Sequence, residues 1–272
     1  MKTMMKLLAA VMALMLCCAP ALAESTDNSL AYIQNKGELI LGLDPTFAPM
    51  GFTDEDGAIV GYDIDVAAEV CARLGVALKC QPIDWTAKEM ELNAKNIDCI
   101  WNGMSISEER LASMSISVPY MNNAMILVVC ADSGIQSKAD LAGRKLGLQG
   151  GSTAEKALDG DAEFKASLDE VVPFEFNAVA LMDLRQGGVD AVLMDLVAAN
   201  YYIATEKADL VCLEETLLPE AYGIGFRKED AELTEAVNNA LFDMVKDGSL
   251  AQITEKWFGA DISSVKDAMP AE

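Results

Sequence analysis

The sequence predicts an α/β protein built from two lobes that face each other across a cleft. Apolar segments of strand length alternate with segments of helical periodicity along most of its 272 residues, which is typical of β-α-β units with a largely parallel sheet. The alternation runs through two blocks of similar construction, and polar residues follow strands in both. Because ligands bind at the carboxyl ends of strands in open α/β sheets, two such lobes predict a ligand cleft that closes by hinge motion.

The first block has the clearer helix signal. The segment 62–74 carries apolar residues at helical spacing and stops before Gly75, a residue that commonly closes helices. The other elements expected in this block are a polar lead-in at 24–36, strands at 38–43, 76–83 and 97–101, and a helix at 87–94.

The second block begins with a long apolar strand at 124–130, and its segment 189–192 repeats the spacing of 97–100. We expect the chain to cross between lobes near Val128–Val129 and Leu218–Gly223. The first lobe would then hold residues 24–127 plus 219–272, and the second residues 128–218. The other expected elements are strands at 145–148, 171–176, 191–194, 210–213 and 222–226, a short helix and turn at 140–143, and helices starting near 152, 196, 230 and 250.

The N-terminus has the layout of a secretory signal peptide, assigned to residues 1–23. Two lysines precede the apolar run 7–16, and the small-x-small sequence Ala21-Leu22-Ala23 follows. We therefore expect a secreted protein, either periplasmic or associated with the cell surface. Lipid attachment at Cys17 or Cys18 is the alternative, although each follows a larger residue than is usual at such sites.

The composition excludes several classes of function. Without histidine, the chain cannot form histidine-dependent nucleophile pairs or histidine-ligated zinc sites. A formal charge of −23 repels phosphate backbones, so no nucleic-acid partner is expected. The cysteines after the leader lack the spacing of zinc or redox sites, and no cofactor or metal is expected. Cys99 and Cys212 are expected to be buried, while a Cys71–Cys80 disulfide stays open.

Asp44 and Phe47 follow the first predicted strand in the sequence Asp-Pro-Thr-Phe. Asp-Pro favours turns, so a turn alone would explain this segment. The functional alternative assigns Asp44 to a cationic group of a ligand and Phe47 to packing against that ligand.

Arg110 lies just beyond the strand 97–101. Ser105 and Glu108 have the spacing of a helix capping box, which places Arg110 in the first helical turn. A cation is unfavourable near the positive end of the helix dipole and needs an anionic partner. Arg110 is therefore either a bidentate clamp for a ligand carboxylate or a surface arginine paired with an acidic side chain.

Two further groups follow strands of the second block. The sequence Gly150-Gly151-Ser152-Thr153 permits close backbone approach at a helix start, where free amides favour an anion, but it also suits an ordinary turn. Asp195 follows the strand 191–194 and either accepts a ligand ammonium or caps the next helix. Combined with Arg110, these groups match a zwitterion, with Thr153 at its carboxylate and Asp195 at its ammonium.

Several segments carry a resemblance to a known family. The sequence resembles the polar-amino-acid group of bacterial extracellular solute-binding proteins (family 3) of ABC importers, over nearly all of residues 37–259. The segments that carry it are 43–49, 61–65, 97–105 with Arg110, 151–155, 225–228 and 256–259. The resemblance implies a periplasmic-binding-protein-like (type II) fold with two hinge crossings, and a monomer that delivers a free amino acid to ABC permease membrane subunits.

The same resemblance implies a set of site residues. Arg110 and Thr153 would hold the α-carboxylate, and Asp195, the Gly103 carbonyl and Ser105 would hold the α-ammonium. Relatives often have Ser-Ser at Asn102-Gly103 and tyrosine at Phe47, so those corners of the site are expected to differ. The full expected set is Asp44, Phe47, Phe52, Trp85, Asn102, Gly103, Met104, Ser105, Arg110, Gln149, Ser152, Thr153 and Asp195.

Ligand identity and function leave alternatives. Asp44 near aromatic faces favours a cationic side chain, first arginine and then lysine, with glutamine and cystine still open. An enzyme is not expected, although a secreted dehydratase acting on cyclohexadienyl or arogenate-type substrates is the alternative because fold does not fix function. A sensor domain or a module of a cell-wall enzyme would require further domains.

Overall fold

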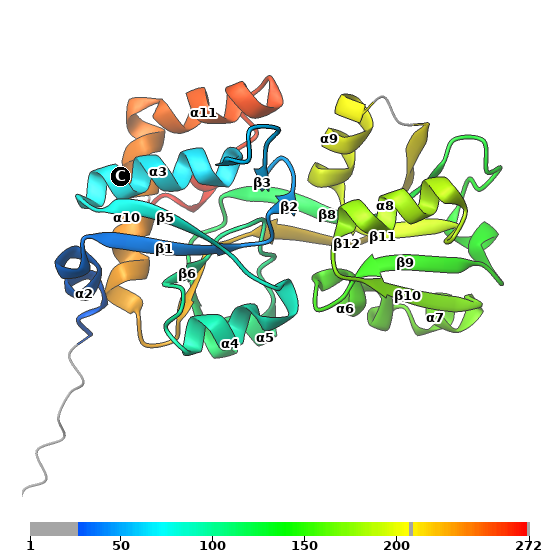
Figure 1. Cartoon of the computed structure of the whole chain (residues 1–272), viewed down its shortest axis with the longest axis horizontal. Coiled ribbons are helices and arrows are strands. Elements are labelled where there is room, and N and C mark those ends of the chain that lie inside the picture. The colour runs from blue at the N-terminus through cyan, green and yellow to red at the C-terminus, as the bar shows by residue number, and fades with distance from the viewer. Residues whose placement is uncertain (1–26, 207–208, 271–272) are drawn as a thin grey trace, which may run out of the picture.

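The computed structural model describes residues 27–206 and 209–270. The expected signal peptide at 1–23, with Cys17 and Cys18, lies outside the described residues. Figure 1 shows two lobes side by side, each with its own sheet and flanking helices. None of the described helices is long and apolar enough to span a bilayer.

The first lobe is organised around a five-stranded sheet of order β5-β1-β6-β13-β7. Strand β1 pairs in parallel with β5 and β6, whereas β13 is antiparallel to β6 and β7. Its strands are β1 (Glu38–Leu43), β5 (Ala77–Pro82), β6 (Cys99–Ile100), β7 (Met114–Ile116) and β13 (Gly225–Arg227), with a small sheet of β2 (Thr46–Phe47), β3 (Gly51–Thr53) and β4 (Ile59–Val60). Its helices are α2 (Ser29–Lys36), α3 (Tyr62–Leu74), α4 (Lys88–Asn93), α5 (Glu108–Ser113), α10 (Ala231–Asp247) and α11 (Ser249–Phe258).

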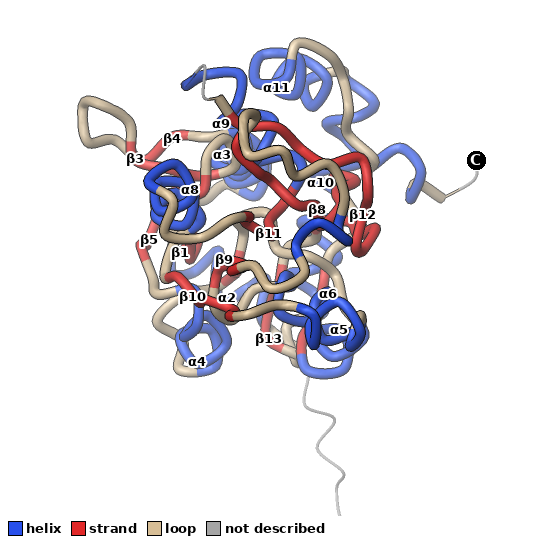
Figure 2. Tube along the Cα trace, turned by 90° about the vertical axis from the view of Figure 1, so that its right-hand side faces the viewer, coloured by secondary structure: helices blue, strands red, loops and turns tan. Residues whose placement is uncertain are grey.

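The second lobe has a five-stranded sheet of order β10-β9-β11-β8-β12. In Figure 2, where this lobe faces the viewer, α8 and α6 lie on opposite faces of the sheet. Its strands are β8 (Met121–Cys130), β9 (Lys145–Gln149), β10 (Glu170–Phe174), β11 (Ala191–Asp195) and β12 (Leu210–Tyr222), and its helices are α6 (Thr153–Gly160), α7 (Ala162–Ser167), α8 (Asn177–Gln186) and α9 (Leu196–Glu206). A short 3-10 helix, Lys138–Leu141, stands near the expected turn at 140–143.

Two antiparallel strands connect the lobes. β8 and β12 run side by side (Figure 1), with Met121 opposite Tyr222 and Asn123 opposite Glu220. Strand β8 therefore begins before the crossing expected near Val128–Val129, because the pairing continues back to the first lobe. The expected strand 222–226 is divided between the end of β12 and the start of β13. The division into lobes at 127/128 and 218/219 stays a prediction.

Most elements follow the sequence pattern, and β1 and α3 have the expected bounds. The polar lead-in is instead partly helical, as α2. One fully buried side chain, Ile33, anchors this helix in the core of the first lobe, and Lys36 at its end pairs with the buried Asp98. The apolar residues of this segment form one contiguous run, 30–33, within a polar stretch, so they show no helical periodicity.

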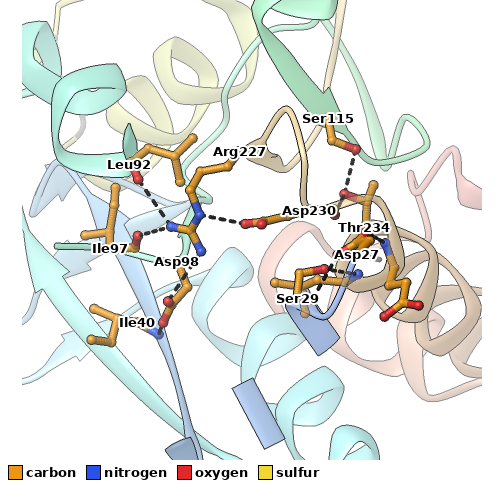
Figure 3. Close-up of polar contacts among 12 residues, drawn as sticks. Asp27, Ser29, Ile40, Leu92, Ile97, Asp98, Ser115, Arg227, Asp230 and Thr234 are labelled. Atoms are coloured by element: carbon orange, nitrogen blue, oxygen red, sulfur yellow. Dashed lines mark hydrogen bonds and ion pairs between the residues drawn. The ribbon is translucent and has the colours of Figure 1, made fainter. Parts of the chain in front are cut away.

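A buried arginine joins the C-terminal part of the chain to the first sheet, as Figure 3 shows. Arg227 Nη1 donates to the carbonyl oxygens of Ile97 at 2.9 Å and Leu92 at 3.2 Å. Its Nε lies 2.8 Å from Asp230 Oδ2, and its Nη2 lies 3.8 Å from Asp98 Oδ1. A buried cation is costly unless it is paired and hydrogen-bonded, and this network supplies both kinds of partner.

Five cysteines lie in the described chain, and all are free thiols: Cys71, Cys80, Cys99, Cys130 and Cys212. Cys99 is buried as expected, whereas Cys212 is only partly buried. The Cys71–Cys80 disulfide that the sequence left open is not formed. Burial raises the pKa of the Cys71 thiol to about 12, so this group is an unreactive small apolar side chain.

Candidate functional site

A cavity lies between the lobes. Strand ends and helix starts of both lobes supply its walls, as expected for facing α/β sheets. Its lining is Asp44, Phe47, Trp85, Asn102, Gly103, Ser105 and Arg110 from the first lobe and Met125, Gln149, Ser152, Thr153 and Asp195 from the second. The cavity thus brings together all but two of the side chains predicted for the site, and it adds Met125.

Phe52 and Met104 do not line this cavity, which corrects their expected place. Phe52 packs between Tyr201, at a ring-centroid distance of 6.1 Å, and Trp257, at 6.0 Å. Met104 is fully buried in the first lobe. Met104 packs in the core of the first lobe, whereas its neighbours Gly103 and Ser105 line the cavity.

Arg110 lines the cavity from the first lobe. It is 4% exposed, and its Nη1 donates to Ser105 O at 2.7 Å and to Thr153 Oγ1 of the other lobe at 3.4 Å. Within the described chain no acidic side chain forms an ion pair with it. Burial, the largest effect on this group, lowers the pKa of Arg110. A buried guanidinium held only by neutral oxygens favours an incoming anion.

The start of α5 corrects the expected capping box. Ser107, not Ser105, is the N-cap, and its Oγ accepts from the Arg110 backbone N at 3.3 Å. Ser105 forms a β-bridge with Tyr222, which holds it extended and delays the helix by two residues. Ser105 is thereby left in the cavity wall.

The start of α6 faces Arg110 from the second lobe. Ser152 is its N-cap and accepts from Ala154 N at 3.2 Å. Gly151, with φ of +67°, makes the turn that leads into the helix. Thr153 is buried in the first turn. A helix N-terminus beside a guanidinium is a suitable seat for a carboxylate.

Asp195 brings a carboxyl group to the cavity from the second lobe. It is buried at the end of β11, and its Oδ1 accepts from Asn123 Nδ2 at 2.7 Å and from the Tyr222 hydroxyl at 2.8 Å. Burial raises its pKa to about 6. The capping role considered for Asp195 is filled by Asn123, whose Oδ1 accepts from Val197 N at 3.2 Å in α9.

Gly103 is fixed by a buried acid behind the cavity wall. Its N–H donates to Asp63 Oδ2 at 2.8 Å, and the Tyr120 hydroxyl donates to the same oxygen at 2.9 Å. Burial raises the pKa of Asp63 to about 7. Gly103 has φ of +59°, and a Cβ there would lie 2.6 Å from the Phe47 ring, so only glycine fits this position without displacement.

Asp44 lies in a third polar corner. Its Oδ1 accepts from the Thr46 N at 2.8 Å and the Thr46 hydroxyl at 2.7 Å, and its Oδ2 accepts from Gln149 Nε2 of the other lobe at 2.9 Å. Burial raises the pKa of Asp44. Asp44 closes the expected turn and also lines the cavity with Phe47 and Trp85, while its contact with a ligand cation stays a prediction.

Further contacts across the cleft show that the lobes are closed. Lys88 is buried, and its Nζ donates to Trp85 O at 3.0 Å within its own lobe and to Gly151 O of the other lobe at 2.9 Å. The Tyr202 hydroxyl donates to Thr46 O at 2.6 Å. Burial lowers the pKa of Lys88 to about 8. Sequence reasoning missed Lys88 because it stands in an ordinary amphipathic helix.

Two α/β lobes joined by two strands, with a buried cation and a buried acid lining one cavity between them, define a cleft-closing binding protein of the type II periplasmic-binding-protein-like fold. The chain belongs to the bacterial extracellular solute-binding proteins, family 3, whose family model matches residues 39–260.

The chain is similar to proteins of this kind along nearly all of its length. It is 31% identical to the L-cystine-binding protein TcyJ of Escherichia coli (strain K12), over 93% of this chain and 95% of that protein. An ABC uptake transporter substrate-binding protein from Streptococcus pneumoniae with bound histidine has a TM-score of 0.85 at 38% identity, covering 88% of this chain and 99% of that one. An ancestral arginine-binding protein bound to arginine has a TM-score of 0.76 at 38% identity, covering 82% and 99%.

Proposed function

We propose that this protein is the extracytoplasmic binding subunit of an amino acid ABC importer, and that it encloses a free L-amino acid with a cationic side chain, arginine first. The observation that carries the proposal is that one cavity is lined by Arg110 from the first lobe and by Asp195 from the second. Arg110 lacks an acidic partner in the described chain, and Asp195 accepts only neutral donors there.

Arg110 and Asp195 together match the two charges on the backbone of an amino acid. Arg110 and the start of α6 would hold the α-carboxylate through charge-assisted hydrogen bonds. Asp195, the Gly103 carbonyl and the Ser105 hydroxyl would hold the α-ammonium. Since buried charges are favourable only when paired, the ligand supplies the opposite charge that Arg110 and Asp195 each lack.

Asp44 supports the choice of a cationic side chain. Its carboxylate is buried, its donors within the described chain are neutral groups, and Trp85 and Phe47 line the same cavity. A guanidinium could pair with the carboxylate and stack on an aromatic face. The relatives named above bind histidine, cystine and arginine, so the side chain must be settled by direct binding.

Binding would proceed by capture on one lobe and closure of the other. Arg110 and Trp85 offer the first docking surface, and closure then brings Thr153, Gln149 and Asp195 against the ligand. Excluding water strengthens each of these charged contacts. The closed protein, acting as a monomer, would deliver the ligand to the permease. The named relatives are binding proteins, and we propose no catalytic step.

A thermal-shift screen of the purified, ligand-stripped protein tests the function. L-arginine should raise the unfolding midpoint, since a ligand that binds only the folded state stabilises it by mass action. D-arginine and agmatine, which keep the guanidinium but misplace or lack the α-carboxylate, should have little effect. If no common amino acid shifts the midpoint, the proposal is wrong. A larger shift with glutamine or cystine would retain the class and replace the ligand.

A further inference from the structure

A second carboxyl group lies directly behind the predicted ammonium site. Glu220 stands on β12 opposite Asn123 of β8, in the pair of strands that connects the lobes. Asn123 Nδ2 donates to Asp195 Oδ1 at 2.7 Å and to Glu220 Oε1 at 2.5 Å. Because one nitrogen reaches both carboxyl groups, Glu220 and Asp195 lie close together.

The orientation of the Asn123 amide is fixed independently of the two acids. Its Oδ1 accepts from Val197 N at 3.2 Å, so its Nδ2 must face the carboxyl groups, and the two N–H bonds there suffice for one contact each. Asn123 therefore cannot offer Glu220 a second donor. The other oxygen of Glu220, Oε2, is buried without a hydrogen-bond partner in the described chain.

Few charges nearby can compensate a second negative charge. The titratable groups that face Glu220 are Asp195 from β11, Tyr222 from its own strand and Arg110 from α5. The Tyr222 hydroxyl is committed to Asp195, and Arg110 is no ion-pair partner of Glu220. Burial, followed by the Asp195 charge, raises the pKa of Glu220 to about 8.

We propose that Glu220 is a positioning residue of the ammonium subsite that shares one proton with Asp195 when the site is empty and releases it when an ammonium binds. This inference rests on the proposed function, because it requires a ligand with an ammonium group. Glu220 acts through Asp195 and is not assigned a direct ligand contact.

The proton balance is simple. In the empty site the pair carries one negative charge and one O–H bond, whose proton lies between the carboxyl groups. The ammonium arrives with three protons and keeps them. Its positive charge favours ionisation of the second carboxyl group, so the O–H bond breaks and the proton passes to the solvent. The bound site then has two carboxylates around one cation.

The sign of the pH dependence follows from this balance. The empty site holds the proton more tightly than the bound site, so a lower pH stabilises the empty site and weakens binding. Affinity should rise with pH by up to about tenfold per unit between roughly pH 6 and 8, and level off above that range. Ligand ammonium groups stay protonated throughout this interval.

Titration calorimetry with L-arginine at pH 7, in buffers of different ionisation enthalpy, measures the protons released on binding. Wild-type protein should release on the order of half to one proton per ligand. Glu220→Gln keeps the size and the Asn123 contact but cannot ionise, so it should release almost none. It should match the wild-type affinity at pH 6 and bind about tenfold more weakly at pH 8.

Glu214→Gln is the matched control, because Glu214 is an exposed acid on the same strand and should leave proton release unchanged. Binding without proton release in the wild type, or equal release by Glu220→Gln, overturns the inference while the proposed function stands. If no common amino acid, L-arginine included, binds in the thermal screen, both the inference and the proposed function are overturned. In the unliganded protein, ¹³C NMR should show a carboxyl resonance whose chemical shift titrates with a midpoint near pH 8. This titration should be absent from Glu220→Gln.

Discussion

Replacing Arg110 with methionine should abolish tight ligand binding without weakening the fold. The side chain is 4% exposed, donates to Ser105 O and Thr153 Oγ1, and forms no ion pair in the described chain. Removing one partner of a buried charge pair costs about 2–5 kcal/mol of binding free energy. That range corresponds to an affinity loss from about 30-fold to several thousand-fold.

The stability of the unliganded protein separates this explanation from simple unfolding. Arg110→Met keeps much of the apolar stem and removes an unpaired buried cation, so the unfolding midpoint without ligand should stay the same or rise. Titration calorimetry with L-arginine and thermal unfolding measure the two quantities. A variant that binds within threefold of wild type, or loses affinity only because it unfolds, would refute the assignment of Arg110 as the carboxylate clamp.

Three further predictions concern other parts of the cleft. Asp44→Asn should weaken the binding of L-arginine by more than about tenfold, which is the cost of one lost charge pair, and the binding of L-glutamine by much less. Equal losses of affinity in calorimetry would contradict a cation site at Asp44. Gly103→Ala should lower the free energy of unfolding in urea by about 1–3 kcal/mol more than Gly134→Ala, since both glycines have positive φ but only Gly103 lacks space for a Cβ; equal losses would show that crowding is unimportant. Lys88→Met should speed ligand release about tenfold by removing a buried hydrogen bond between lobes, whereas Lys156→Met, which loses only an exposed ion pair, should change the release rate little. Equal stopped-flow release rates for the two variants would show that the Lys88 contact does not hold the lobes closed.

The sequence located groups whose role depends on a local signal. Asp44 follows β1 and Asp195 ends β11, while Thr153 and Arg110 lie in the first turns of the helices α6 and α5, and the two sheets carry all four to one cleft. The helix bounds of α3 were equally readable, because its periodicity and closing glycine are local. Local sequence signals were therefore enough to predict which charged residues line the cavity.

Groups that depend on distant pairing escaped prediction. Glu220 contacts Asn123 only because β8 and β12, the two strands that connect the lobes, pair with each other. Nothing in the sequence near either residue indicates this contact. Ser105 was misjudged as a cap for a similar reason, since its bridge to Tyr222 joins segments far apart in the chain. Met104 shows the remaining limit, because the sequence of a short irregular segment does not reveal which of its side chains are buried.

Strand β13 has a consequence for the order in which the chain can assemble. It lies between β6 and β7 in the first sheet, although more than 100 residues separate it from either in sequence. The first lobe cannot complete its sheet until Gly225–Arg227 has been synthesised, whereas residues 121–222 hold every strand of the second sheet. Since distant contacts form slowly, the second lobe can fold as a contiguous unit while β6 and β7 still lack the strand that joins them.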